Sequence, residues 1–78
     1  MNNLEKYNQA FVEAFEVSED VLNDLKYQDI PEWDSVGHMT LIALLEDAFN
    51  IMMETDDIID FSSYVIGKEI LSKYDIQF

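Results

Sequence analysis

Apolar residues recur along this chain every three or four positions, which is the spacing of helices that bury one face. Four segments follow this rule: residues 4–15, residues 35–50, a short stretch from Thr55, and a last segment that starts after Ser62 or Ser63. No run alternates apolar and polar residues as a half-buried strand does. The pattern predicts an all-α fold of three longer helices and one short helix.

Polar residues that can accept hydrogen bonds from helical N–H groups stand at each predicted helix start. These candidate caps are Asn2 or Asn3, Asp34 or Ser35, Thr55, and Ser62 or Ser63. In the last helix the inward face is predicted to consist of Val65, Ile66, Ile70, Leu71 and Tyr74.

A long loop is predicted between the first two helices, over residues 16–34. Ser18 can cap a short turn within it, and Pro31 disfavours helical dihedral angles at Ile30. The loop also carries large apolar side chains, and we therefore expect it to be ordered. These side chains include Tyr27, Ile30 and Trp33.

Length and charge limit what the chain can do. Its 78 residues predict a single domain over residues 1–78 with one modest core, and the absence of cysteine fits a reducing compartment such as the cytoplasm. No signal peptide or spanning segment is recognised, so membrane insertion is not expected. Seventeen acidic against four basic residues give a net charge of -13, which would repel nucleic acid and favour partners with Arg and Lys patches.

The predicted helix over residues 35–50 carries two separate apolar stripes. The larger one should face the core and consists of Leu41, Ile42, Leu45 and Phe49. The smaller one lies on a different face, has no evident reason to be buried, and consists of Val36, Met39 and Ala43. Because Glu46 and Asp47 border it, we interpret it as a docking strip for a basic partner.

The start of this helix contains a recognisable motif. The segment Trp33–Met39 has the sequence Trp-Asp-Ser-Val-Gly-His-Met. It resembles the attachment motif of acyl carrier proteins, Asp-Ser-Leu or a near variant at the head of helix two, with Val36 where Leu is commoner. The helix order, the long first loop and the Phe61–Tyr64 segment are also similar to that family, so the resemblance covers nearly the whole chain.

The resemblance implies a four-helix acyl-carrier-like bundle that has no catalytic residues of its own. A phosphopantetheinyl transferase would attach 4'-phosphopantetheine from coenzyme A to the Ser35 hydroxyl, and acyl groups would be carried as thioesters on the arm. The carrier would be a monomer that serves acyl- or aminoacyl-loading and transferring enzymes with basic surfaces. A phosphodiester suits this position because a helix start offers unpaired N–H groups and partial positive charge.

Acidic residues near this helix would form the recognition surface in such a carrier. Asp34 is expected to cap the helix and, by the resemblance, to contact the transferase. The other acids of this surface would be Glu46, Asp47, Glu54, Asp56 and Asp57. The family also implies a groove between helices two and three for the cargo, for which the candidate lining residues are Met52, Met53, Ile58 and Ile59.

Two features leave the type of carrier open. Gly37, His38 and Thr40 stand where the housekeeping fatty-acid type carries further acids, which indicates a specialised carrier. Gly37 either lets a partner's backbone approach closely or is a tolerated small residue. The open alternatives are an aminoacyl or peptidyl carrier, and an unmodified acidic interaction module in which Ser35 is only a helix cap.

Catalytic and metal-binding interpretations find less support. His38 lies one turn after Ser35, but a serine hydrolase also needs a Gly-x-Ser-x-Gly elbow and an oxyanion hole, neither of which is recognised. We expect His38 to be a partly buried structural residue. Asp56, Asp57 and Asp60 lack the spacing of a calcium loop. With one His and no Cys, a zinc site is not expected either.

Overall fold

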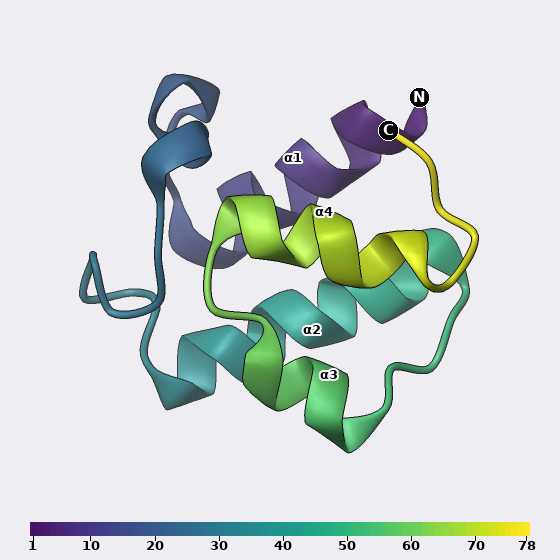
Figure 1. Cartoon of the computed structure of the whole chain (residues 1–78). Coiled ribbons are helices and arrows are strands. Elements are labelled where there is room, and N and C mark those ends of the chain that lie inside the picture. Colours follow the sequence, from purple (N-terminus) through teal and green to yellow (C-terminus); the bar gives the residue numbers. More distant parts are fainter.

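The computed structural model describes residues 1–78, which form only helices and loops. The elements are α1 (Asn3–Phe15), the 3-10 helix η1 (Glu19–Asp24), α2 (Ser35–Phe49), α3 (Thr55–Asp60) and α4 (Tyr64–Ser72). The predicted all-α class is confirmed. Figure 1 shows α4 lying in front of α1 and α2, with α3 below them and η1 at the upper left. None of these helices combines the length and the apolar character needed to cross a membrane.

Local sequence signals set both ends of α1. The Asn2 side chain accepts a hydrogen bond from the Glu5 amide at 2.8 Å, and the Glu5 carboxylate accepts one from the Asn2 amide at 3.2 Å. This capping box satisfies two N–H groups at the start of the helix. After Phe15 the chain turns away, because Glu16 adopts the left-handed conformation with φ of 57°. The buried face consists of Tyr7, Ala10, Phe11 and Phe15.

The second helix presents its larger apolar stripe to α1. Leu41, Ile42 and Leu45 are buried and Phe49 is half-buried, as the periodicity predicts. α1 packs along α2, so this stripe and the aromatic face of α1 together form one side of the core.

The last two helices begin in different ways. Ser63 caps α4, as predicted, because its Oγ accepts a hydrogen bond from the Ile66 amide at 3.0 Å. The Thr55 cap is wrong: Thr55 is the first helical residue of α3, and the N-cap residue Glu54 makes no side-chain cap bond. The inward placement of Val65 and Ile66 is also wrong, since both are exposed. The buried face of α4 is instead Tyr64, Gly67, Ile70 and Leu71.

Trp33 brings the loop between η1 and α2 into the centre of the core. Its side chain is fully buried, and its ring stacks on Phe15 with 5.0 Å between centroids and 25° between planes. It also meets the Phe11 ring edge-on at 5.6 Å. The Trp33 amide donates to the Ile30 carbonyl at 3.1 Å, and its carbonyl accepts from the Gln28 amide at 3.0 Å. The last turn before α2 is therefore closed by its own backbone and anchored on α1.

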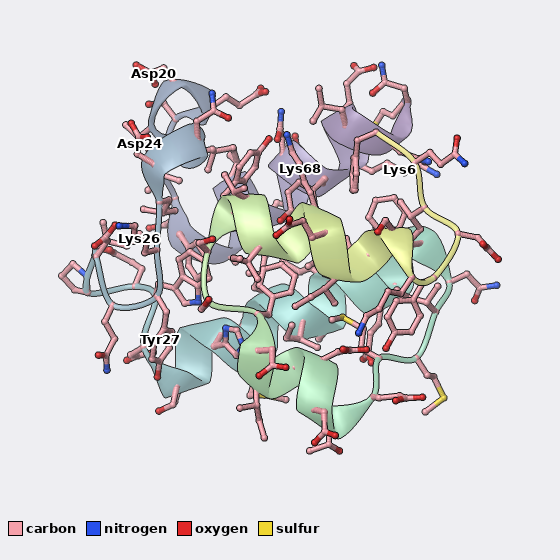
Figure 2. All side chains as sticks on the ribbon, in the orientation of Figure 1. Lys6, Asp20, Asp24, Lys26, Tyr27 and Lys68 are labelled. Carbon is pink, nitrogen blue, oxygen red and sulfur yellow. The ribbon has the colours of Figure 1, made fainter.

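Backbone hydrogen bonds join the same loop to the segment between α3 and α4. The Tyr27 amide donates to the Ser62 carbonyl at 2.9 Å, and the Tyr64 amide donates to the Leu25 carbonyl at 3.0 Å. These bonds flank an isolated antiparallel bridge between Lys26 and Ser63. Figure 2 shows the result, in which Tyr27 lies beside the start of α2.

Gly67 lies where α4 comes closest to the aromatic core. A Cβ atom there would lie 2.2 Å from the Phe61 ring and 2.2 Å from the Tyr7 hydroxyl oxygen. Tyr7 is held in place because its hydroxyl donates to the Tyr64 carbonyl at 2.6 Å, and burial raises the pKa of Tyr7. Gly in a helix costs about 1 kcal/mol relative to Ala. Here it leaves room for the Tyr7 and Phe61 side chains against α4.

We expect Gly67→Ala to lower the free energy of unfolding by about 1–3 kcal/mol, because overpacking against rigid rings outweighs the gain in helix propensity. Urea denaturation followed by circular dichroism measures this. The control is Glu69→Ala, an exposed position of α4, which should change stability by less than about 0.5 kcal/mol. A Gly67→Ala variant as stable as the parent would contradict this account of the packing.

Candidate functional site

Ser35 is the first residue of α2, and its side chain is exposed. Asp34 precedes it as the N-cap, and the Asp34 Oδ1 accepts a hydrogen bond from the Gly37 amide at 2.8 Å. The predicted cap is therefore Asp34 and not Ser35. Because the cap is supplied by its neighbour, the Ser35 hydroxyl is not needed to start the helix. It lies at the end of α2 where the helix dipole is positive.

The backbone of the preceding loop lies directly against Gly37. A Cβ atom at this position would lie 1.8 Å from the Glu32 carbonyl oxygen and 3.0 Å from its carbonyl carbon. The close backbone approach that Gly37 permits is intramolecular, so Gly37 is not merely a tolerated small residue. It lets the Glu32 backbone lie against the first turn of α2 and so helps to fix Asp34 and Ser35.

Two apolar grooves meet at Ser35. The α2 groove runs along the exposed face of the helix and is lined by Ser35, Val36, Met39, Thr40, Ala43 and Leu44. The α2–α3 groove has a volume of about 380 Å³, and its lining includes Ser35, Tyr27, His38, Met39, Ile58, Ile59 and Phe61. Val36 is 75% exposed and Met39 is 53% exposed, so the smaller apolar stripe is on the surface as predicted. Ser35 and Met39 border both grooves.

His38 closes one side of the α2–α3 groove through both of its ring nitrogens. Nδ1 accepts a hydrogen bond from the Trp33 indole N–H at 2.9 Å, and Nε2 lies 2.8 Å from the Ile58 carbonyl oxygen. Since one partner is a donor and the other an acceptor, the ring is the neutral tautomer that carries its proton on Nε2. His38 is the partly buried structural residue expected. Neither nitrogen is free to act as a base for Ser35.

A polar cluster fastens α3 to the end of α4. The Asp57 carboxylate accepts hydrogen bonds from Lys73 Nζ at 2.5 Å and from the Tyr74 hydroxyl at 2.6 Å. The Tyr74 oxygen in turn accepts from the Glu54 amide at 2.9 Å. The bonds from Lys73 and Tyr74 lower the pKa of Asp57, and the bond to Asp57 raises the pKa of Lys73.

The acids assigned to the recognition surface divide into two groups. Asp34, Asp47, Glu54 and Asp56 are exposed. Glu46 is half-buried, and its carboxylate accepts a hydrogen bond from the Met53 amide at 2.9 Å, which orders the turn after α2. Asp57 is buried and held by Lys73 and Tyr74, so its assignment to an exposed acidic surface is corrected. Its neighbour Asp56 is the acid of this pair that faces solvent.

Positive charge is sparse near the grooves. Figure 2 shows Lys6 and Lys68 on α1 and α4, on the opposite side of the view from α3. Lys68 lies over the Tyr64 ring at 4.6 Å, and Lys73 is paired with Asp57. Lys26 is next to the groove residue Tyr27 in the sequence and forms no ion pair. The exposed acids beside the α2 groove therefore have few lysines to neutralise them.

The groove differs in its lining from the sequence prediction. Ile58 and Ile59 line it as expected, but Met53 is buried in the core and Met52 is exposed outside it. Tyr27 and Phe61 also line the groove, and the sequence did not indicate either of them as a lining residue. Tyr27 arrives through the loop bonds to Ser62, which no periodicity in the sequence predicts.

Comparison with known proteins adds no relative. No protein-family model, curated protein or solved structure matches this chain. The arrangement of its carboxylates and its histidine forms no group of three or more side chains that could hold a metal ion. Ser35 and the two grooves that meet there are therefore the features of this chain that bear on its function.

We expect Gly37→Ala to lower the free energy of unfolding by about 1–3 kcal/mol, because the atom in its way is a backbone carbonyl that cannot rotate aside. Urea denaturation measures the change. Thr40→Ala, one turn later on the exposed face of α2, should change stability by less than about 0.5 kcal/mol. Equal stability of the two variants would show that Glu32 does not lie against the helix.

The Asp57 cluster predicts a pH-dependent loss of stability on the acidic side. Because the folded pKa of Asp57 lies below its ordinary 3.8, its stabilising contribution is complete above that value and is lost as the pH falls through the folded pKa. Asp57→Asn should therefore destabilise the chain at neutral pH, with the difference from the parent shrinking below about pH 4. Urea denaturation at several pH values measures it.

The matched control for this prediction is Asp56→Asn, which removes one charge from an exposed neighbour. It should leave stability nearly unchanged at neutral pH. If both variants behaved alike across the pH range, the effect would be one of net charge and not of the bonds from Lys73 and Tyr74.

Proposed function

We propose that this chain is an acyl carrier protein that bears 4'-phosphopantetheine on Ser35 and carries acyl groups as thioesters on that arm. The observation that carries the proposal is the position of Ser35. Its hydroxyl is exposed at the first turn of α2, Asp34 supplies the cap in its place, and two apolar grooves meet beside it.

The residues around Ser35 suit a covalently attached phosphodiester. The Asp34 side chain takes the Gly37 amide, and the earlier N–H groups of the first turn have no helical partner. These groups and the positive end of the helix dipole favour an anion on the Ser35 oxygen. The close contact of Gly37 with Glu32 holds the serine in place while it is exposed.

The α2 groove supports the proposed contact with partner enzymes. Val36 and Met39 are large apolar side chains left on the surface directly beside Ser35, and Ala43 continues the strip along α2. The exposed acids Asp34 and Asp47 would favour a basic enzyme surface. On this proposal the transferase and the loading enzymes approach from the α2 side, and the carrier acts as a cytoplasmic monomer.

The α2–α3 groove supports an acyl cargo. Its walls near Ser35 are formed mostly by apolar and aromatic side chains, including Ile58, Ile59 and Phe61. Such a surface favours an aliphatic chain over a charged aminoacyl group, which would lose hydration without gaining a charged partner.

The decisive experiment adds coenzyme A, Mg²⁺ and a promiscuous phosphopantetheinyl transferase to the purified chain and measures its intact mass. We expect a single phosphopantetheine-sized gain in the parent and none in Ser35→Ala. Because Ser35 lies on the surface and does not cap α2, Ser35→Ala should unfold at nearly the same urea concentration as the parent.

The matched control is Ser62→Ala, which alters another exposed hydroxyl at the α2–α3 groove and should be modified like the parent. A folded parent that gains no mass would favour the unmodified acidic interaction module. A gain that persists in Ser35→Ala would place the attachment elsewhere.

A further inference from the structure

Three groups form a continuous hydrogen-bonded chain across the inner side of the α2–α3 groove. The Trp33 indole N–H donates to His38 Nδ1 at 2.9 Å, and His38 Nε2 bonds to the Ile58 carbonyl at 2.8 Å. Trp33 belongs to the loop, His38 to α2 and Ile58 to α3. The chain therefore ties the element that carries Ser35 to the opposite wall of its groove.

Apart from these hydrogen bonds, few apolar contacts hold α3 in place. The helix has only six residues, Ile58 is half-buried, and Ile59 is 72% exposed. Its N-cap residue Glu54 makes no side-chain cap bond. Hydrogen bonds from two adjacent residues of α3 attach it to the rest of the fold, and we call them clamps. Asp57 bonds to Lys73 and Tyr74, and the Ile58 carbonyl bonds to His38.

We propose that the Trp33–His38–Ile58 chain is a latch that holds α3 against α2 and sets the width of the α2–α3 groove, and that protonation of His38 releases it. The suggestion that the latch controls access of an acyl cargo to the groove rests on the proposed carrier function. His38 acts in it as a positioning residue, because it touches neither Ser35 Oγ nor any reacting atom. The latch itself is a property of the unmodified chain.

Protonation opposes the latch for a geometric reason. An imidazolium ring has two N–H donors and no acceptor, so its Nδ1–H would face the Trp33 N–H. Trp33 cannot give way, since it is fully buried, stacked on Phe15 and edge-on to Phe11. His38 is only half-buried and can turn toward water. When it turns, its bond to the Ile58 carbonyl is lost as well.

No neighbouring charge is placed to hold the imidazolium in the latch. The groups that face the ring are Trp33 and Tyr27 from the loop, the Ile58 carbonyl from α3, and Phe61 from the segment after it. Tyr27 is the titratable group among them, and its ring is 5.5 Å from that of His38. The structure has a single ion pair with nitrogen and oxygen within 4.0 Å, and it joins Lys73 to Asp57. No carboxylate therefore lies within 4.0 Å of the His38 nitrogens.

The second clamp, which holds Asp57, does not share this response. Bonds from Lys73 and Tyr74 lower the pKa of Asp57, so its carboxylate stays ionised over the range in which histidines usually titrate. A change in α3 over that range therefore does not arise from titration of Asp57.

Amide hydrogen exchange of the unmodified chain, read by NMR, tests the latch. The Ile58 amide donates to the Glu54 carbonyl at 3.0 Å and reports on α3, while the Gly67 amide donates to the Ser63 carbonyl at 2.9 Å and reports on α4. After correction for intrinsic rates, we expect Ile58 protection to fall about fivefold from about pH 7.5 to pH 5.5, the effect of one lost hydrogen bond. Protection of Gly67 should stay constant.

Two variants separate a latch from a merely structural histidine. Gln at this position can accept from Trp33 through its oxygen and donate to Ile58 through its amide nitrogen, but it does not titrate. His38→Gln should therefore keep Ile58 protected at both pH values. Trp33→Phe keeps an aromatic ring, though a smaller one, and removes the N–H donor, so protonation no longer brings two donors together and the pH response should shrink.

The result on wild-type chain and His38→Gln decides the proposal even if Trp33→Phe does not fold. Constant Ile58 protection in the parent, or an equal fall in His38→Gln, would overturn the latch. Because no phosphopantetheine is involved, this outcome is distinguishable from a failure of Ser35 to be modified. Amide exchange reports the latch and intact mass reports the modification of Ser35, so either result can be seen without the other.

Discussion

The burial of Trp33 is the interaction on which the rest of this structure depends. A loop residue fills the space between α1 and α2, where its ring stacks on Phe15 and its indole N–H finds an acceptor in His38. A buried indole N–H without a partner would be costly, so the position of His38 follows from that of Trp33. Ser35 lies between Trp33 and His38 in the sequence, so the burial of Trp33 and the bond between these two side chains fix its position.

α3 is held by few apolar contacts, chiefly those of Ile58, and by two polar clamps. A helix of six residues gains little stability by itself, and this one leaves Ile59 in water. Its two clamps, one through His38 and one through Asp57, cost little to open and close compared with a packed core. A groove with one wall held mainly by polar contacts, beside an exposed serine, would suit the proposed carrier function.

The sequence predicted much of the fold because its signals are local. Asn2 with Glu5, Asp34 with Gly37, and Ser63 with Ile66 each involve residues three apart, and all three caps form. The same reasoning failed where partners are distant. Asp57 sits in an exposed-looking acidic stretch, yet its partners Lys73 and Tyr74 come from the end of α4 and bury it.

By itself the sequence determined the all-α class, the capped starts of α1, α2 and α4, and a serine at the start of an apolar helix, because these depend on the helical repeat and short-range hydrogen bonds. Only the tertiary structure decided which residues surround that serine. Tyr27 reached the groove through backbone bonds to Ser62, and Gly37 was needed for the Glu32 carbonyl. Such contacts join separate elements at defined distances, and no spacing along a chain encodes them.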